Sequence, residues 1–303
     1  MQYTYYKFDA RRLTLAELWR SCNNPLEFLI AAFCKLIRVN VAPQFGIART
    51  DRLVRIAAGA VPDFAKARLS PLIQQAEALG MVPGFYFTIP TAGAMEGYSF
   101  PMRNADGQFV LSIDCIRIAV GTTVNDKATF YFSSKLHDGQ YLITSGSKQE
   151  ENMPSGYEGR YFPGRPMSEV LQLHQQRLSE QTTGVQTVAD SEQLERRVFE
   201  YEQSVMEFQI DRGVFVPLPA DEVQRLKSQP RVADVPSVSS EPNSSAPRPQ
   251  WLEWGSWLTL LFGIFLFSKG NANQAQLIFR LALIGVGLVG VILFQIARLL
   301  RNR

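Results

Sequence analysis

Residues 108–120 read QFVLSIDCIRIAV, and residues 128–136 read ATFYFSSKL. Both stretches are rich in Val, Ile, Phe and Tyr, which favour β-strands, and turn residues border them. The segments 104–107 (NADG) and 137–139 (HDG) contain Asp and Gly, which tolerate the positive φ angles of hairpin turns. This pattern predicts strands that pair with their neighbours along the chain in antiparallel order.

Similar stretches occur on both sides, so the sequence predicts an antiparallel meander of four or five strands. Residues 214–219 are expected to add a short strand. Residues 150–165, which are rich in Gly, Pro and Tyr, are predicted to form a loop. The predicted strands of the meander are 82–89, 97–103, 108–120, 128–136 and 140–145.

Helical patterns flank the meander and complete an α+β fold class. The capping box TLAE at 14–17 predicts a helix over 15–22. The sequence NPLE at 24–27 supplies an N-cap, a Pro at the first helical position and a Glu two residues later, so a second helix is expected over 25–39. Further helices are predicted over 63–79, 166–181 and 190–212.

The predicted helix 25–39 is apolar, but it is too charged and its apolar run is too short to span a membrane. Two interpretations remain open for it. It is either a core helix of the domain or an interfacial helix that lies on a bilayer.

Two apolar runs near the C-terminus, 251–268 and 277–300, predict a two-helix transmembrane hairpin with a short polar loop, 269–276. Each run is apolar on all faces, unlike the helices of a water-exposed surface. Aromatic and basic side chains occupy the expected membrane interfaces of this hairpin. These residues are Trp251, Trp254, Trp257, Arg280, Arg298 and Arg301.

The rest of the chain is expected to divide around this hairpin. Residues 1–227 are predicted to form one cytosolic α+β domain, since that length is enough for a well-buried core. Residues 228–250 contain five Pro and six Ser, which predicts a disordered linker. Basic residues before the hairpin and in the tail 301–303 predict an integral, two-pass membrane protein with both termini in the cytoplasm.

The net charge of +3 is unevenly distributed. Residues 1–70 have a balance of +6, residues 71–250 a balance of −7, and residues 251–303 a balance of +4. The basic N-terminal part is expected to face anionic lipid head groups or to pair with the acidic middle of the same chain. No nucleic-acid partner is expected, because no basic and aromatic run typical of such a module appears.

No sequence motif identifies a reaction, a cofactor or a metal ion. Neither histidine belongs to a metal-binding spacing, and the sequence contains no nucleophile elbow and no phosphate-binding loop. Asp114 interrupts the apolar pattern of its predicted strand, and Arg117 or Lys135 is its expected partner. Together with His137 in the following turn, Asp114 and Arg117 are the candidates for a pocket.

The sequence therefore predicts a membrane-anchored interaction or regulatory module whose partners are the lipid bilayer and a protein. One alternative is an oligomeric, channel-like or membrane-active assembly that the N-terminal domain gates. Another is an enzyme without a recognisable motif. A pocket that gathers Asp114, His137 and a nearby Ser or Cys would favour the enzyme.

Overall fold

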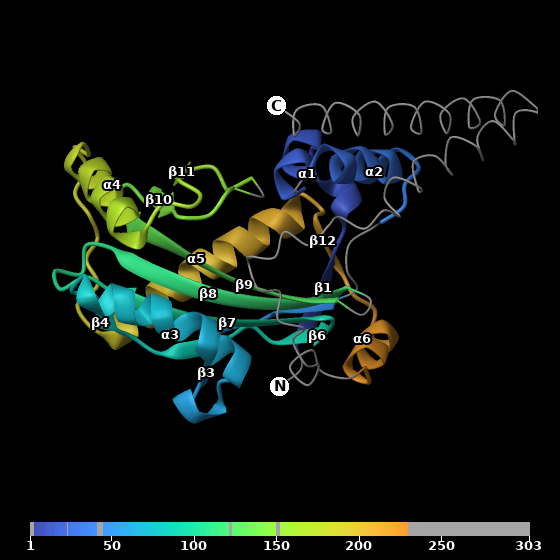
Figure 1. The fold of residues 1–303 in the computed structure, drawn as a ribbon, viewed down its shortest axis with the longest axis horizontal. Helices are drawn as coiled ribbons and strands as arrows, with labels where there is room; N and C mark the ends of the chain where they lie inside the picture. Colours follow the sequence, from blue (N-terminus) through green and yellow to red (C-terminus); the bar gives the residue numbers. More distant parts are fainter. Residues whose placement is uncertain (1–2, 23, 41–44, 121–122, 150–151, 230–303) are drawn as a thin grey trace, which may run out of the picture. The chain divides into compact units, whose positions relative to one another are not determined.

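A computed structural model describes most of the N-terminal three-quarters of the chain. These residues form an α+β structure with antiparallel sheets and flanking helices, so the predicted fold class is confirmed for this part of the chain (Figure 1). All of 251–303 and all but the first two positions of the predicted linker 228–250 lie outside the described residues. The described residues are 3–22, 24–40, 45–120, 123–149 and 152–229.

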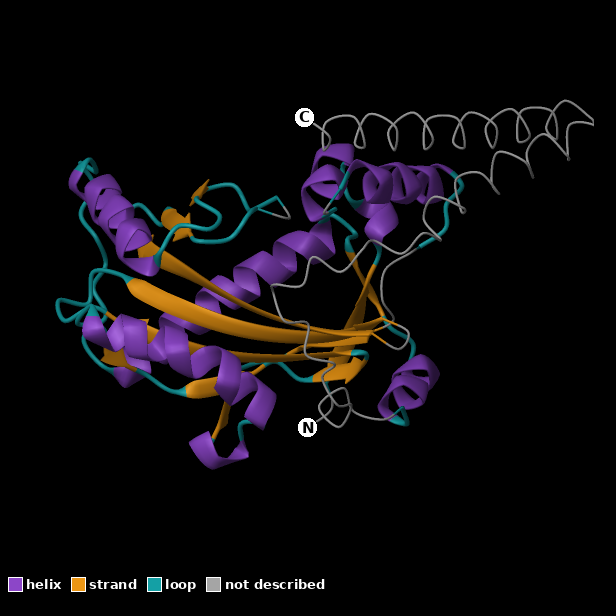
Figure 2. Ribbon diagram, viewed as in Figure 1, coloured by secondary structure: helices purple, strands orange, loops and turns teal. Residues whose placement is uncertain are grey.

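The larger sheet contains eight strands, and the antiparallel series β7 to β10 forms its centre (Figure 2). Its order is β11-β10-β9-β8-β7-β5-β3, with β4 beside β7. The turn between β7 and β8 requires Gly107, whose φ is +68° and where a Cβ atom would lie 2.2 Å from the Val188 carbonyl oxygen. The strands are β3 Val54–Ile56, β4 Val82–Pro83, β5 Tyr86–Thr88, β7 Met95–Arg103, β8 Val110–Val120, β9 Thr123–Lys135, β10 Tyr141–Ser145 and β11 Tyr157–Tyr161.

This sheet has eight strands, whereas a meander of four or five was predicted. Strand β3 was not predicted, and the predicted strand 82–89 is divided into β4 and β5. Strand β9 begins at Thr123, five positions before the predicted start at 128. Strand β11 lies inside the predicted loop 150–165 and pairs with β10 in parallel, so the prediction of a loop there is wrong for these five residues. A short edge strand is difficult to predict because its partner, rather than its own sequence, determines whether it pairs.

A smaller sheet joins the two ends of the described chain. Its order is β12-β1-β2-β6, and Lys7 in β1 lies opposite Val216 in β12. Helix α6 packs on it through Val223 and Leu226, which contact a cluster that includes Tyr5. The elements are β1 Thr4–Phe8, β2 Phe45–Arg49, β6 Thr91–Gly93, β12 Phe215–Pro217 and α6 Ala220–Lys227.

Helices cover both faces of the larger sheet (Figure 1). Leu111 and Ile113 of β8 point into a core that α3 and α4 complete. Val110 points to the opposite face, because successive side chains of a strand alternate, and there it packs with Leu194 and Val198 of α5. The other helices are η1 Ala10–Arg12, α1 Leu15–Ser21, α2 Pro25–Leu36, η2 Ala58–Ala60, α3 Asp63–Ala78, α4 Met167–Ser179 and α5 Ser191–Asp211.

Among the residues that the structure describes, no helix is both long and apolar enough to cross a membrane. Helix α5 has 21 residues, but charged side chains occur along its length. Helix α2 is more apolar, but its 12 residues reach only about 18 Å, whereas a hydrocarbon core is about 30 Å thick. The described helices therefore contradict the prediction of a transmembrane, multi-pass membrane protein. The runs 251–268 and 277–300, on which that prediction rested, lie outside the described residues.

Candidate functional site

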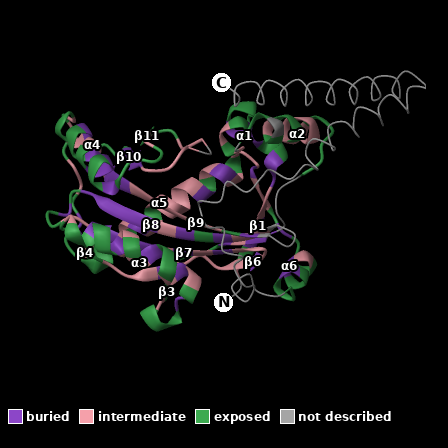
Figure 3. Cartoon of the chain, viewed as in Figure 1, coloured by how far each residue is buried: buried purple, intermediate pink, exposed green. Residues whose placement is uncertain are grey.

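Most of the large exposed apolar residues lie on α1, α2 and the residues that follow α2. Figure 3 shows exposed positions along both of these neighbouring helices. The side chain of Leu36 is 79% exposed, that of Leu15 56% and that of Trp19 53%. Elsewhere in the described residues only Ile116 belongs to this class. We call this group the α1–α2 apolar face, and it consists of Leu15, Trp19, Leu29, Ile30, Leu36, Ile37 and Val39.

Helix α2 directs its larger aliphatic side chains away from the body of the protein. Its inner side consists of Phe28, Ala31 and Ala32, which pack against a buried cluster around Leu13 and Leu18. The outer side carries the bulkier Leu and Ile residues of the α1–α2 apolar face. The small alanines allow α2 to approach η1 and α1 closely. The larger aliphatic side chains point outward because their positions along the sequence place them on the opposite side of the helix.

Local sequence signals form both helices. The Thr14 side chain accepts a hydrogen bond from the Glu17 N–H, and the Glu17 carboxylate accepts one from the Thr14 N–H, which completes the predicted capping box. Asn24 caps α2 in the same way by accepting from the Glu27 N–H, and Pro25 occupies the first turn. These contacts confirm both predicted helix starts.

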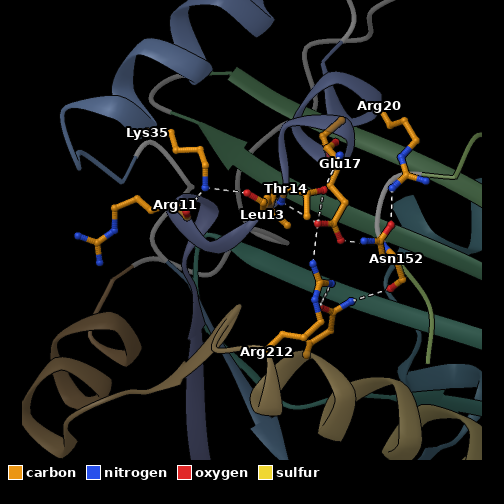
Figure 4. A network of polar contacts seen from close by, with 10 residues as sticks. Arg11, Leu13, Thr14, Glu17, Arg20, Lys35, Asn152 and Arg212 are labelled. Carbon is orange, nitrogen blue, oxygen red and sulfur yellow. Dashed lines mark hydrogen bonds and ion pairs between the residues drawn. The ribbon is translucent and has the colours of Figure 1, made fainter. Parts of the chain in front are cut away.

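The fully buried Glu17 also fastens α1 to distant parts of the chain (Figure 4). One carboxylate oxygen accepts from Arg212 Nη2 at 2.6 Å, and the other accepts from the Asn152 N–H at 2.8 Å. Burial alone would raise the pKa of Glu17. The hydrogen bonds from Arg212, Asn152 and Thr14 outweigh that effect and lower the pKa to about 2. Glu17 is therefore ionised at neutral pH and links α1 to the end of α5.

Polar contacts fix α2 as well (Figure 4). Lys35 Nζ donates to the Leu13 carbonyl at 2.7 Å and also donates to the Arg11 carbonyl. Beyond α2, the Asn40 side chain accepts from the Ala10 N–H at 3.1 Å. The α1–α2 apolar face is consequently held on a defined support.

Cationic side chains surround this apolar face. Arg11, Arg12 and Arg38 are exposed, and Lys35 lies at the C-terminal end of α2. Asp9 is buried and pairs with Arg11, and Glu17 is buried and pairs with Arg212, so the exposed acid of α1 and α2 is Glu27. The surroundings of the face are therefore positively charged.

A hollow of about 310 Å³ opens beside Trp19, at the junction of α1 and α2. Arg20 and Lys148 line it, and none of the described residues that line it carries a carboxylate. Arg20 Nη2 donates to Asn152 Oδ1 at 2.6 Å, and Lys148 Nζ donates to the Cys22 carbonyl at 3.3 Å. Arg20 Nε is buried and has no hydrogen-bond partner among the described residues. The hollow is thus lined by two cationic side chains, a combination that suits an anionic group.

The structure separates the three residues that the sequence suggested for a pocket. Asp114 lies on the α5 face of β8, whereas Arg117 lies on the α3 face, because an odd spacing along a strand places side chains on opposite faces. Arg117 pairs with Asp126 at 2.6 Å, and its guanidinium lies 3.7 Å from the centre of the Phe64 ring. His137 lies in the exposed turn after β9, where its N–H donates to the Gly184 carbonyl.

The expected partners of Asp114 are engaged elsewhere. Lys135 donates to Glu200 at 2.9 Å, and Arg117 pairs with Asp126. Asp114 instead accepts a hydrogen bond from Ser99 on the neighbouring strand β7. Burial raises the pKa of Asp114 to about 6, and the hydrogen bond from Ser99 opposes this shift only in part.

Sequence reasoning missed a second acid beside Asp114. Glu202 of α5 faces the sheet, where it accepts a hydrogen bond from Tyr131 of β9. Burial, followed by repulsion from Asp114, raises the pKa of Glu202 to about 8, against the hydrogen bond from Tyr131. The clue in the sequence was that Glu202 follows Tyr201, a residue of the apolar seam of α5. Tyr131 and Tyr201 lie beside each other, with ring centres 5.4 Å apart.

The other histidine, His174, is fully buried in α4. Its Nε2 atom lies 3.0 Å from Ser134 Oγ, and its Nδ1 atom lies 2.9 Å from Thr144 Oγ1. Burial and the nearby Arg177 charge lower the pKa of His174 to about 3, so the ring is neutral and joins α4 to the sheet. Within the described ranges, no group of three or more His, Cys, Asp or Glu side chains is placed to hold a metal ion.

The six predicted membrane-interface residues, Trp251, Trp254, Trp257, Arg280, Arg298 and Arg301, lie outside the described residues. In comparisons with known proteins, no family model, no curated protein and no solved structure matches the chain.

Proposed function

We propose that residues 3–229 form a binding module whose contact surface is the α1–α2 apolar face. The observation that supports this function is the gathering of seven of the eight large exposed apolar side chains of the described residues on α1, α2 and the residues that follow α2. Single exposed apolar residues are common on proteins, but a contiguous group of them is typical of a binding surface. Removing one such side chain from water stabilises a complex by about 1.5 to 3 kcal/mol.

The support beneath this surface suits binding. Glu17 connects α1 to Arg212 and Asn152, and Lys35 connects α2 to η1 and Leu13. A surface on a fixed support loses less conformational entropy on binding than a mobile segment does. Four polar contacts hold these two short helices in place, although their larger aliphatic side chains point outward. This arrangement suits a contact surface better than helices that serve only to cover the core.

Photo-crosslinking in the cells that produce the protein tests this function. A photo-reactive amino acid replaces Leu36 or Leu15 in the full-length chain, and Ile116 carries the same probe as a matched exposed control. We expect adducts at Leu36 and Leu15 well above the level at Ile116, with mass spectrometry identifying the molecule attached. Equal adduct levels at all three positions would contradict the proposed function.

A further inference from the structure

We infer that the α1–α2 apolar face binds the surface of an anionic lipid bilayer. This inference rests on the proposed function and specifies the partner. The contact concerns the surface only: α2 would lie along the lipid head groups with its outer side among the first acyl carbons. A helix of 12 residues with one apolar side suits that position.

The shape of the face favours a bilayer over a grooved protein partner. Leu36 and Leu15 protrude, with 79% and 56% of each side chain exposed. The hollow at the junction of α1 and α2 is lined by Trp19 and Pro25 as well as by Arg20 and Lys148, and none of its described lining residues is Leu, Ile or Val. Protruding aliphatic groups enter a fluid layer without needing a complementary cavity, and Trp19 lies between the apolar and the polar parts, where indole rings are favoured at bilayer interfaces.

Charge complementarity specifies the kind of bilayer. Arg12 and Arg38 are exposed around the face, whereas the exposed Arg11 is paired with the buried Asp9 at 2.7 Å. The exposed acid in α1 and α2 is Glu27. Basic residues near an anionic leaflet each contribute about 1 kcal/mol, a roughly fivefold change in binding. Arg20 and Lys148, which line the hollow at the edge of the same face, offer a place for a head-group phosphate.

The backbone at Arg38 supports a role for its charge. Arg38 has a φ of 61°, and it is the only residue other than Gly with a positive φ among those described. Glycine would occupy this position with less strain, since a Cβ atom disfavours left-handed backbone. An arginine here lies between the exposed Ile37 and Val39 in the sequence, so it places a cation next to apolar residues of the face.

The fluorescence of Trp19 tests the inference in the full-length chain. Replacing Trp251, Trp254 and Trp257 by Phe leaves Trp19 as the only tryptophan, so the signal reports on this face alone. We expect a blue shift of Trp19 emission, and its quenching by brominated lipids, on vesicles of phosphatidylcholine with phosphatidylserine. Vesicles of pure phosphatidylcholine, or added salt, should weaken the response.

Variants in the same background locate the contact. Leu36→Glu is expected to weaken binding to the phosphatidylserine vesicles by about tenfold or more. Arg38→Gly relieves the backbone strain and should still weaken binding about fivefold, so a loss of fold does not explain the result. Ile116→Glu is the matched control and should leave the Trp19 response unchanged.

Three outcomes would overturn the inference. The first is a Trp19 signal that anionic vesicles do not change, and the second is an Ile116→Glu effect as large as that of Leu36→Glu. The third is an equal response to soluble glycerophosphoserine, which would indicate a free phosphate ligand. If the first outcome occurs while photo-crosslinking at Leu36 captures a protein, the lipid inference fails and the proposed function stands. Without vesicle response and without adducts, both fail.

Discussion

The pKa values of two acids of this protein, the fully buried Glu17 and the half-buried Glu202, shift in opposite directions. Glu17 receives hydrogen bonds from a guanidinium, two backbone N–H groups and a hydroxyl, and its pKa falls to about 2. Glu202 receives one from the Tyr131 hydroxyl and lies near the like charge of Asp114, and its pKa rises to about 8. Burial favours the protonated form of both acids, so the neighbouring groups decide the direction.

Glu17 and the cluster of Asp114, Glu202 and Tyr131 also differ in how ionisation affects the stability of the fold. At Glu17, ionisation and folding stabilise each other, because the carboxylate accepts hydrogen bonds from Arg212 and from the Asn152 and Thr14 N–H groups. At the cluster of Asp114, Glu202 and Tyr131, full ionisation would place two negative charges in one site. That site is therefore expected to hold a proton at neutral pH and to become less stable as the proton leaves.

The largest expected effect is at Glu17. Glu17→Gln removes the charge opposite Arg212 and should lower the free energy of unfolding by about 3 kcal/mol at pH 7, because the guanidinium loses its ionic partner. Urea unfolding followed by circular dichroism measures this change. Glu192→Gln is the control: its pair with Arg196 is exposed, so a change of at most about 0.5 kcal/mol is expected.

Glu17→Gln should also change how the free energy of unfolding depends on pH. The pKa of Glu17 is lowered in the folded state, so its contribution is present above the unfolded value of about 4.5 and is lost as the pH falls toward 2. The difference between the wild type and Glu17→Gln should therefore shrink over this interval. A constant difference from pH 7 to pH 2 would contradict the pKa assigned to Glu17.

Substitution of Glu202 should have an effect of intermediate size on the free energy of unfolding, and it should stabilise the protein rather than destabilise it. The folded pKa of Glu202 is raised, so the stability linked to its proton is present below about pH 4.5 and is lost as the pH rises toward 8. Glu202→Gln is expected to stabilise the protein by roughly 1 to 2 kcal/mol at pH 8 and to have little effect near pH 5. Thermal unfolding over this pH range measures it. Glu200→Gln, on the same helix, is the control, and an equal pH dependence there would contradict the assignment.

Tyr131→Phe should have the smallest effect of the three. It removes the hydroxyl that donates to Glu202, which should raise the pKa of that carboxyl further and cost about 1 kcal/mol. Carbon-13 NMR titration of the glutamate carboxyl groups measures the pKa directly. A Glu202 resonance that titrates at an unchanged or lower pH would show that Tyr131 does not stabilise the carboxylate.

Local signals allowed much of the secondary structure to be predicted. The capping box at Thr14 and Glu17, the Asn24-Pro25 start and the Asp190 N-cap act within one helical turn, and each helix begins where these residues place it. Gly107 likewise determines its turn through its own backbone. Partners distant in sequence left no comparable signal: β1 pairs with β12, and β11 joins β10 from within a predicted loop.

The candidate site shows the same division. The apolar pattern of residues 25–39 predicted a helix, but it left open whether that helix belongs to a core or lies at an interface. The structure decides that Phe28 and the alanines face inward and the larger aliphatic residues face outward. Likewise, Asp114 was marked as unusual from its strand pattern alone, but its neighbours Ser99 and Glu202 became known only from the packed sheet and α5.

The sequence by itself determined where helices and turns begin, since caps, prolines and glycines act through backbone geometry over a few residues. Only the tertiary structure decided which charged side chains meet and how their pKa values shift. Glu17 meets Arg212 across 195 positions of chain, and Glu202 reaches the strand that carries Asp114. Such pairs depend on how whole helices and strands pack. Two side chains far apart in the sequence interact only when the fold brings them close together.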